Sequence, residues 1–430
     1  MSAETIPWKT RDADLVPGPV YLLRFDKDGR LTSPRSLEAL LRAARDATDV
    51  VLFSHGWNND FAAATSRYDR FFGHLDDVVR RQGPPRRPWR PVHVGVIWPS
   101  TALVMPDERG PDIAGGTGDD LDAELAVLAD DLGADQVAEL RALLADPGPG
   151  EDGAARAAQI LATLPTDDET GADDAPVDGA ELLEVWRDTR QTLAPAPPAR
   201  RGGIIDDETE LAGPDVAGLD PFALLRDGIR LTTVRLMKDR GGRVGARGVG
   251  PVVRDLVAAG PRLHLVGHSY GCRVVLSAVC HGAPPVPAVD SVLLLQPALS
   301  ALAFAPDVGG RPGGYRDAMR RVRLPIVTTR SRHDVPLTKV FHLALRRRSD
   351  LGEAAIAGGV SRYAALGGFG PQGTGPGELV RLPMPDVGGP YPLTGTHRLV
   401  EVDGTAFIPG HGDVESDQTA WALLCQIEQD

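Results

Sequence analysis

A Gly-x-Ser-x-Gly pentapeptide is the clearest chemical signal in the sequence. It reads Gly267-His268-Ser269-Tyr270-Gly271, after the apolar run LHLV and before CRVVLSAVC, a run with helical spacing. The two glycines permit a strained turn between a strand and a helix, which lifts the serine hydroxyl out of a sheet. The pattern therefore predicts that Ser269 is a nucleophile on a strand–turn–helix element.

A nucleophilic serine needs a base within hydrogen-bond reach, and the base needs a third group to fix its tautomer. In the family of folds in which this motif is known to carry a nucleophile, the acid and then the histidine follow the serine along the chain. Asp334 follows the apolar run LPIVTT and the polar turn RSRH, where a strand end would present its carboxylate. Asp307, after the preceding strand, is the second candidate. The alternative role for Asp334 is the N-cap of a helix over PLTKVF.

His411 is the favoured base. It lies in IPGHGDVES, a glycine-flanked loop directly before the last helix, whereas His397 begins a strand and His333 and His342 lie too near the acid. A lone histidine between glycines is more often a surface turn residue. The combination with a serine and an acid favours a catalytic role.

An early apolar run, DVVLFS, ends at His55-Gly56-Trp57. Together with GHSYG, a late aspartate and a last histidine, this arrangement resembles the α/β-hydrolase superfamily, in its esterase and lipase branch. The resemblance covers the core and not residues 101–220. It implies an oxyanion hole formed by the N–H groups of Trp57 and Tyr270. The alternative for His55-Gly56 is a plain turn from strand to loop.

The resemblance implies acyl transfer: Ser269 attacks a small-molecule carboxylic ester, and water then hydrolyses the acyl-enzyme. Esters of lipids or of other apolar acyl groups are one class of substrate that it implies. This chemistry needs no metal and no other cofactor. Amide hydrolysis and acyl transfer to an alcohol are alternatives on the same triad. A binding or scaffold protein that keeps the fold without turnover is the alternative from another class.

Strand and helix patterns alternate along much of the chain, which predicts an α/β fold with a mostly parallel central sheet and helices on both faces. Apolar runs predict strands within 20–25, 49–60, 92–100, 262–271, 289–300, 323–334 and 397–404, and helical spacing predicts helices over 34–45, 61–82, 221–238 and 416–429.

We expect one catalytic core interrupted by a large acidic insert. Residues 1–100 form its first part, 101–220 the insert, and 221–430 the part that carries the triad. The insert holds 29 acidic and 7 basic residues, whereas the rest of the chain is net positive. The insert is either a lid over the site or a solvated appendage. The charge split predicts that it docks on a basic face of the core and that this contact loosens as salt is raised.

Within the insert, helical spacing is clear at 121–132 and 180–193. The stretches 164–179 and 194–208 are rich in proline and charge, which predicts mobile linkers. After the insert comes the glycine-rich stretch 239–250, which matches neither phosphate-binding loop pattern. We expect a loop there. Its Arg240, Arg243 and Arg247 either form a solvated basic face or hold a substrate phosphate or carboxylate.

Composition narrows the class of protein. The chain has 430 residues, 42% hydrophobic and 24% charged, as soluble globular proteins do, and no apolar run approaches the roughly 18 residues of a membrane span. A start without an apolar leader predicts a cytoplasmic protein. The net charge of −13 disfavours a nucleic-acid partner. Three cysteines without CxxC spacing, Cys272, Cys280 and Cys425, are expected to be small core residues.

Overall fold

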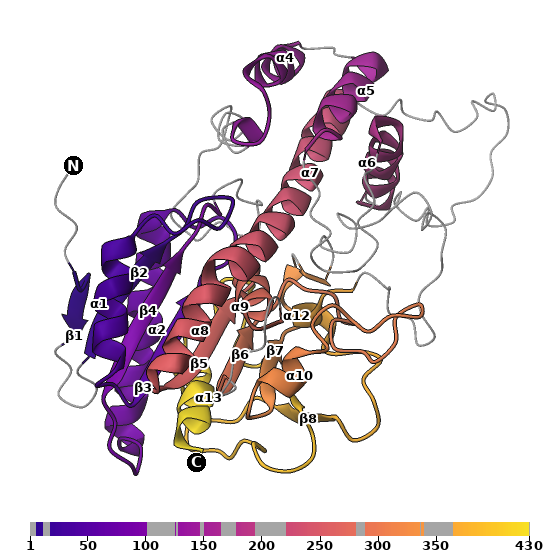
Figure 1. The fold of residues 1–430 in the computed structure, drawn as a ribbon. Coiled ribbons are helices and arrows are strands. Elements are labelled where there is room, and N and C mark those ends of the chain that lie inside the picture. Colours follow the sequence, from indigo (N-terminus) through magenta and orange to yellow (C-terminus); the bar gives the residue numbers. More distant parts are fainter. Residues whose placement is uncertain are drawn as a thin grey trace, which may run out of the picture.

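In a computed structural model the chain forms an α/β fold around a mostly parallel sheet (Figure 1). The structure describes residues 6–11, 18–100, 125, 128–146, 150–164, 178–193, 221–280, 289–335, 337–338 and 364–429. The described strands are β1 (Lys9–Arg11), β2 (Gly18–Arg24), β3 (Asp49–Ser54), β4 (Pro91–Ile97), β5 (Arg262–His268), β6 (Ser291–Leu295), β7 (Ile326–Arg330), β8 (Leu379–Pro383) and β9 (Leu399–Asp403).

The nine strands lie in the order β1-β2-β4-β3-β5-β6-β7-β9-β8. The first pair, β1 with β2, is antiparallel, and the other neighbours pair in parallel. The carboxyl ends of β3, β5, β6, β7 and β9 therefore meet at one edge, where an open parallel sheet presents its functional loops. The predicted α/β class with a mostly parallel sheet is confirmed.

Helices cover both faces of this sheet. Successive residues of β3 show the reason: Val50 and Leu52 pack into one apolar cluster with α1 and α8, and Val51 and Phe53 pack into another with α2 and α13. The described helices are α1 (Pro34–Ala44), α2 (Phe61–Gln82), α4 (Ala134–Ala145), α5 (Gly150–Leu161), α6 (Gly179–Leu193), α7 (Pro221–Arg243), the π-helix η2 (Val244–Val249), α8 (Gly250–Ala259), α9 (Gly271–Cys280), α10 (Ala318–Arg321), α12 (Leu366–Phe369) and α13 (Asp417–Glu428).

The glycine-rich stretch 239–250 is helical, so the predicted loop is wrong. Helix α7 continues through η2 into α8. The glycines serve close packing, since a Cβ on Gly245 would lie 2.3 Å from the carbonyl oxygen of Val274. The predicted solvated basic face is also wrong for Arg240 and Arg243, which are buried, although the side chain of the third arginine is exposed.

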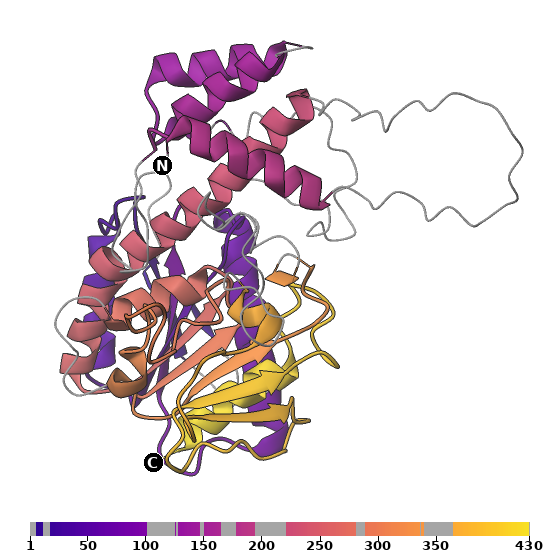
Figure 2. The same ribbon diagram turned by 90° about the vertical axis from the view of Figure 1, so that its right-hand side faces the viewer.

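Helices α4, α5 and α6 and the first half of α7 form a helical arm that stands beyond the sheet (Figure 2). The continuous helix 221–259 runs antiparallel to β5 and spans about 58 Å, whereas the strand spans about 23 Å. Since the helix ends near the amino end of β5, its first half projects past the carboxyl edge. The arm therefore rises from the same edge of the sheet as Ser269.

The arm is held together by apolar packing, and two ion pairs of one buried carboxylate join it to the core. Gly228 of α7 packs directly on the indole ring of Trp186 in α6, where a Cβ would lie 2.1 Å from the ring. Asp131, preceding α4, is paired with Arg240 at 2.6 Å and with Lys27 at 2.8 Å. Asp131, whose side chain is 3% exposed, is thus one acidic residue of 101–220 that pairs with basic residues of the core; docking of the insert as a whole stays a prediction. Salt screens such a buried pair only weakly.

Most of the other features predicted within 101–220 lie outside the described residues. These comprise the start of the helical piece at 121–132, most of the stretch 164–179 and all of 194–208. The helix predicted at 180–193 is confirmed as α6. None of the described helices combines the length and apolarity that a membrane span requires.

Candidate active site

The pentapeptide forms the turn between β5 and α9. Ser269 has a φ of +54°, in the left-handed region that side chains other than glycine rarely adopt. Its neighbours permit the tight passage: a Cβ on Gly267 would lie 2.6 Å from the Cα of Cys272, and one on Gly271 would lie 2.1 Å from the carbonyl oxygen of Ser54. The predicted strand–turn–helix is confirmed, with the strained residue at the serine.

The three predicted catalytic side chains form one continuous hydrogen-bonded array. The distance from Ser269 Oγ to His411 Nε2 is 2.8 Å, and from His411 Nδ1 to Asp334 Oδ2 it is 2.7 Å. The serine follows β5, the aspartate follows β7, and the histidine lies in the loop between β9 and α13. Ser269 is 4% exposed, Asp334 is fully buried, and the His411 side chain is 10% exposed.

Asp334 uses its two carboxylate oxygens differently. Oδ1 accepts a hydrogen bond of 3.0 Å from the backbone N–H of Leu337, which caps the turn that follows. Oδ2 accepts from His411 and from Nε2 of Gln296, at 2.8 Å. Asp334 thus accepts hydrogen bonds both from the imidazole of His411 and from the backbone of the turn that follows it. Asp307, the second candidate, is exposed and accepts a turn hydrogen bond from the N–H of Gly310; within the described part of the chain it does not join the array.

Gln296 was not predicted as a site residue. It directly follows β6, is fully buried, and has a φ of +44°. Its backbone N–H donates to Oγ1 of Thr329, whose hydroxyl in turn donates to the Gln296 side chain at 3.0 Å. Contacts between the ends of β6 and β7 thus fix the side-chain amide of Gln296, which donates to Asp334. The signal in the sequence was a lone polar residue at the end of an apolar run, at the same sheet edge as the serine.

The loop after β3 lies directly against the serine. A Cβ on Gly56 would lie 2.6 Å from Cβ of Ser269, so only glycine allows this approach. Asn59 fixes the conformation of the loop, because its Nδ2 donates hydrogen bonds to the carbonyl oxygens of Gly56 at 3.2 Å and Trp57 at 2.8 Å. Among the described residues the backbone N–H of Trp57 has no hydrogen-bond acceptor. The Trp57 ring lies 6.4 Å from that of Tyr270.

His55 supports this loop from inside the core. Its Nδ1 lies 2.8 Å from the carbonyl oxygen of Gly56, and its ring stacks on Trp98 at 5.6 Å. Complete burial lowers the pKa of His55 to about 4, so the ring is neutral at pH 7. His55 therefore shapes the loop and is not placed to exchange protons with Ser269.

His268 positions the loop that carries His411. Its Nε2 donates to the backbone carbonyl oxygen of His411 at 2.9 Å, and the two rings lie 5.1 Å apart. Burial lowers the pKa of His268 well below its ordinary value, and the positive charge of Arg67 adds to the effect. A neutral His268 keeps a second positive charge away from the imidazole beside it.

Arg67 of α2 joins the two loops on either side of the serine. Its guanidinium donates to the side-chain oxygen of Asn59 at 3.4 Å and to the carbonyl oxygen of Gly412 at 3.3 Å, and it is paired with the carboxylate of Glu415. The Arg67 and Glu415 side chains are 11% and 7% exposed. The loop of Gly56 and the loop of His411 are therefore tied to one charged group.

The remaining candidate histidines lie elsewhere. His397 is not the first residue of β9, and its Nε2 donates to the carbonyl oxygen of Pro392. His333 is exposed, and His342 lies outside the described residues. The three cysteines are free: two are buried, as expected, and Cys280 is half-buried.

Comparison with known proteins does not assign this site. No protein-family model, no curated protein and no solved structure matches the chain. Its function is therefore inferred from the chemistry of the side chains that the fold brings together.

Proposed function

We propose that the chain is a serine hydrolase of the α/β-hydrolase fold, which cleaves a small-molecule carboxylic ester or lipid ester through an acyl-enzyme on Ser269. One observation carries this proposal: Asp334, His411 and Ser269 are joined by hydrogen bonds of 2.7 Å and 2.8 Å at the carboxyl edge of a parallel sheet. This order is the one in which a buried carboxylate orients an imidazole and the imidazole activates a hydroxyl.

In the proposed reaction Ser269 Oγ attacks the ester carbonyl carbon while His411 Nε2 takes the hydroxyl proton. Asp334 stabilises the imidazolium through Nδ1. The C–O bond to the alcohol then breaks, and the alcohol leaves with the proton from Nε2. Water, deprotonated by the same nitrogen, attacks the acyl carbon and releases the carboxylic acid, which restores the serine.

We infer that the oxyanion of the tetrahedral intermediate is bound by the N–H groups of Trp57 and Tyr270. The close approach of Gly56 to Ser269 and the hold of Asn59 on the Trp57 carbonyl oxygen support the first donor. Tyr270 directly follows the serine at the start of a helix, where backbone N–H groups and the helix dipole favour negative charge. Each such donor typically contributes about 3 kcal/mol to transition-state stabilisation.

We further propose that residues 101–220 are an acidic insert in the hydrolase core. The placement of the helical arm at the edge of the sheet that carries Ser269 supports a role as a lid. On this account substrate access depends on the arm.

A non-catalytic binding protein is the second candidate, because Ser269 is only 4% exposed. Hydrolysis of 4-nitrophenyl acetate and butyrate separates the two. We expect turnover by the wild type and a loss of about 10⁴-fold or more in Ser269→Ala and Asp334→Asn. The matching 4-nitroanilides test amide hydrolysis, and added alcohol tests acyl transfer. Equal rates in wild type and Ser269→Ala would support the binding protein.

A further inference from the structure

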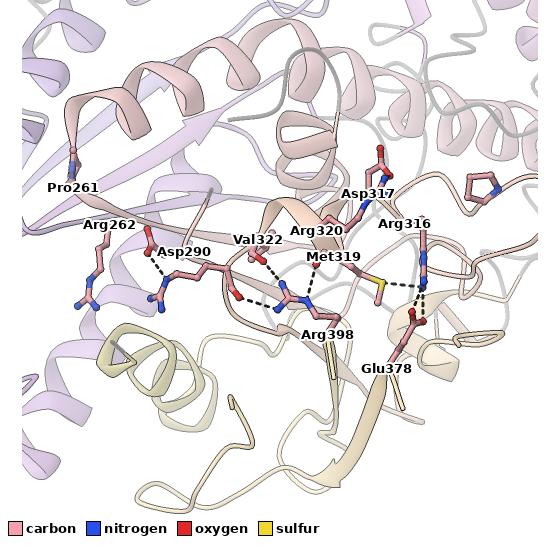
Figure 3. Close-up of a pocket in the computed structure, with 13 residues that line it drawn as sticks. Pro261, Arg262, Asp290, Arg316, Asp317, Met319, Arg320, Val322, Glu378 and Arg398 are labelled. Carbon is pink, nitrogen blue, oxygen red and sulfur yellow. Dashed lines mark hydrogen bonds and ion pairs between the residues drawn. The ribbon is translucent and has the colours of Figure 1, made fainter. Parts of the chain in front are cut away.

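A cavity of about 960 Å³ (Figure 3) is lined by residues at the amino ends of the strands. It therefore lies at the edge of the sheet opposite to Ser269, which follows the carboxyl end of β5. This volume is at the upper end of the range for small-molecule sites, about 300–1,000 Å³. Its walls come from the segments that lead into β5, β6, β7, β8 and β9 and from α10. Its charged lining is dominated by arginine: Arg262, Arg316, Arg320, Arg323 and Arg398, against three acidic residues.

The three acids are each engaged by one of these arginines. Arg323 is paired with Asp290 at 3.0 Å, and Arg316 donates hydrogen bonds to both carboxylate oxygens of Glu378. Arg320 is paired with Asp317, on the exposed side of the cavity. Two arginines of the lining are therefore left without an acid of the cavity as partner.

Of these two arginines, Arg398 has the guanidinium whose hydrogen bonds best indicate an anion site. Its guanidinium donates to three backbone carbonyl oxygens, those of Met319 at 2.8 Å, Arg323 at 3.1 Å and Val322. A guanidinium carries five N–H groups, so two of them have no partner among the described residues. Burial lowers the pKa of Arg398 from its ordinary value. Three carbonyl oxygens fix the orientation of a positive charge that has no ion pair with any carboxylate of the described residues.

Arg262 adds a second positive charge to the lining, at a distance from Arg398 (Figure 3). Its guanidinium donates to the carbonyl oxygens of Ile427 and Gln429, and it shares the buried carboxylate of Asp49 with Arg87 and His264. One carboxylate therefore serves two arginines. The balance of charge around the cavity favours an anion.

We propose that this cavity binds the phosphate group of a small phosphorylated molecule. The fixed N–H groups of a guanidinium match phosphate oxygens, and a dianion offsets the two charges of Arg398 and Arg262 better than a monocarboxylate does. The cavity is much larger than one phosphate ion. Met319, Val322 and Pro261 provide apolar surface for the organic part of the ligand.

Isothermal titration with phenyl phosphate, inorganic phosphate and benzoate tests this site. We expect phenyl phosphate to bind best and its affinity to fall as salt is raised. Arg398→Leu should weaken its binding about tenfold. Arg320→Gln, at a side chain that is 79% exposed, should weaken it less, and it keeps the test valid if the first variant does not fold. Arg141→Gln, on the exposed face of α4, is the control for charge alone.

Three outcomes would overturn the proposal. Absence of phenyl phosphate binding to the wild type at millimolar concentrations is the first. Equal affinity for benzoate would remove the preference for phosphate, and equal losses in Arg141→Gln and the cavity variants would remove the site. None of these residues contacts the array of Ser269, so the result does not depend on the proposed hydrolysis.

Discussion

Gln296 and His411 donate hydrogen bonds to the same oxygen of Asp334, at 2.8 Å and 2.7 Å. The other carboxylate oxygen accepts the N–H of Leu337. With donors on both oxygens the carboxylate has one orientation, and that orientation fixes the imidazole. Gln296 is therefore a positioning residue for the proposed base.

Gln296→Leu removes one of these donors and keeps a side chain of similar volume. We expect the second-order rate of Ser269 labelling by a fluorophosphonate to fall about tenfold, because the carboxylate and the imidazole lose their fixed orientation. Gln372→Leu is the matched control, since Gln372 is half-buried and its amide nitrogen donates only to the carbonyl oxygen of Phe369. Equal rates in Gln296→Leu and wild type would show that the amide has no positioning role.

Gly56→Ala tests the close approach of the proposed oxyanion loop. The new methyl group would lie 2.6 Å from Cβ of Ser269, so the loop must move and the Trp57 N–H moves with it. We expect ester hydrolysis to fall at least a hundredfold, the loss typical of one missing oxyanion donor. Gly73→Ala, in an open position of α2, is the control and should stabilise the protein by up to about 1 kcal/mol. Unchanged hydrolysis by Gly56→Ala would place the oxyanion hole elsewhere.

Arg67→Met removes the charge that ties the two loops. Glu415 would be left buried with only Arg70, at 3.3 Å, so we expect the free energy of unfolding to fall by about 3 kcal/mol. The labelling rate of Ser269 should also fall, since His411 and Gly56 lose a common support. Arg70→Met is the matched control, because its side chain is 52% exposed and contacts the same carboxylate. If both variants behave alike, Arg67 contributes only charge and not the link between the loops.

The sequence was sufficient to predict the parts of this fold that follow from local patterns. Helix α2 begins and ends at the predicted residues, because Asp60 caps its N-terminus and Gly83 ends it. The long apolar runs gave the buried strands. The edge strands β1 and β8 were missed, since three residues of KTR and the half-exposed LVRLP lack a buried-strand pattern.

Contacts between distant segments account for what the sequence could not show. Gly242, Gly245 and Gly250 pack against α9, an interaction that local propensity does not encode, and a loop was predicted in error. Arg67 and Glu415 are separated by almost the whole chain, so nothing in either segment indicates the pair. Ser269, Asp334 and His411 were found because each lies at an element boundary with its own local signal.

Buried neutral histidines make stability depend on pH. Burial lowers the pKa of His93 to about 3 and that of His55 to about 4, whereas both are near 6.5 in an unfolded chain. Below pH 6.5 the unfolded chain binds protons that the folded chain does not. The contribution of these neutral histidines to the free energy of unfolding is therefore fully present above about pH 6.5. It falls progressively as the pH is lowered toward 3.

His93→Leu should flatten this dependence, because both ring nitrogens of His93 are buried without a partner and the variant removes one titrating group. Urea unfolding at a series of pH values measures the slope. His333→Leu, at an exposed position, is the control. A slope in His93→Leu as steep as in the wild type would contradict the assignment.

Intact-mass analysis after treatment with a fluorophosphonate shows whether Ser269 is an activated nucleophile. The array of Asp334, His411 and Ser269 predicts a single adduct on the wild type, located at Ser269 by peptide mapping, and none on folded Ser269→Ala. A folded wild type that takes no adduct, or one that is labelled equally after Ser269→Ala, would contradict an activated serine at this turn.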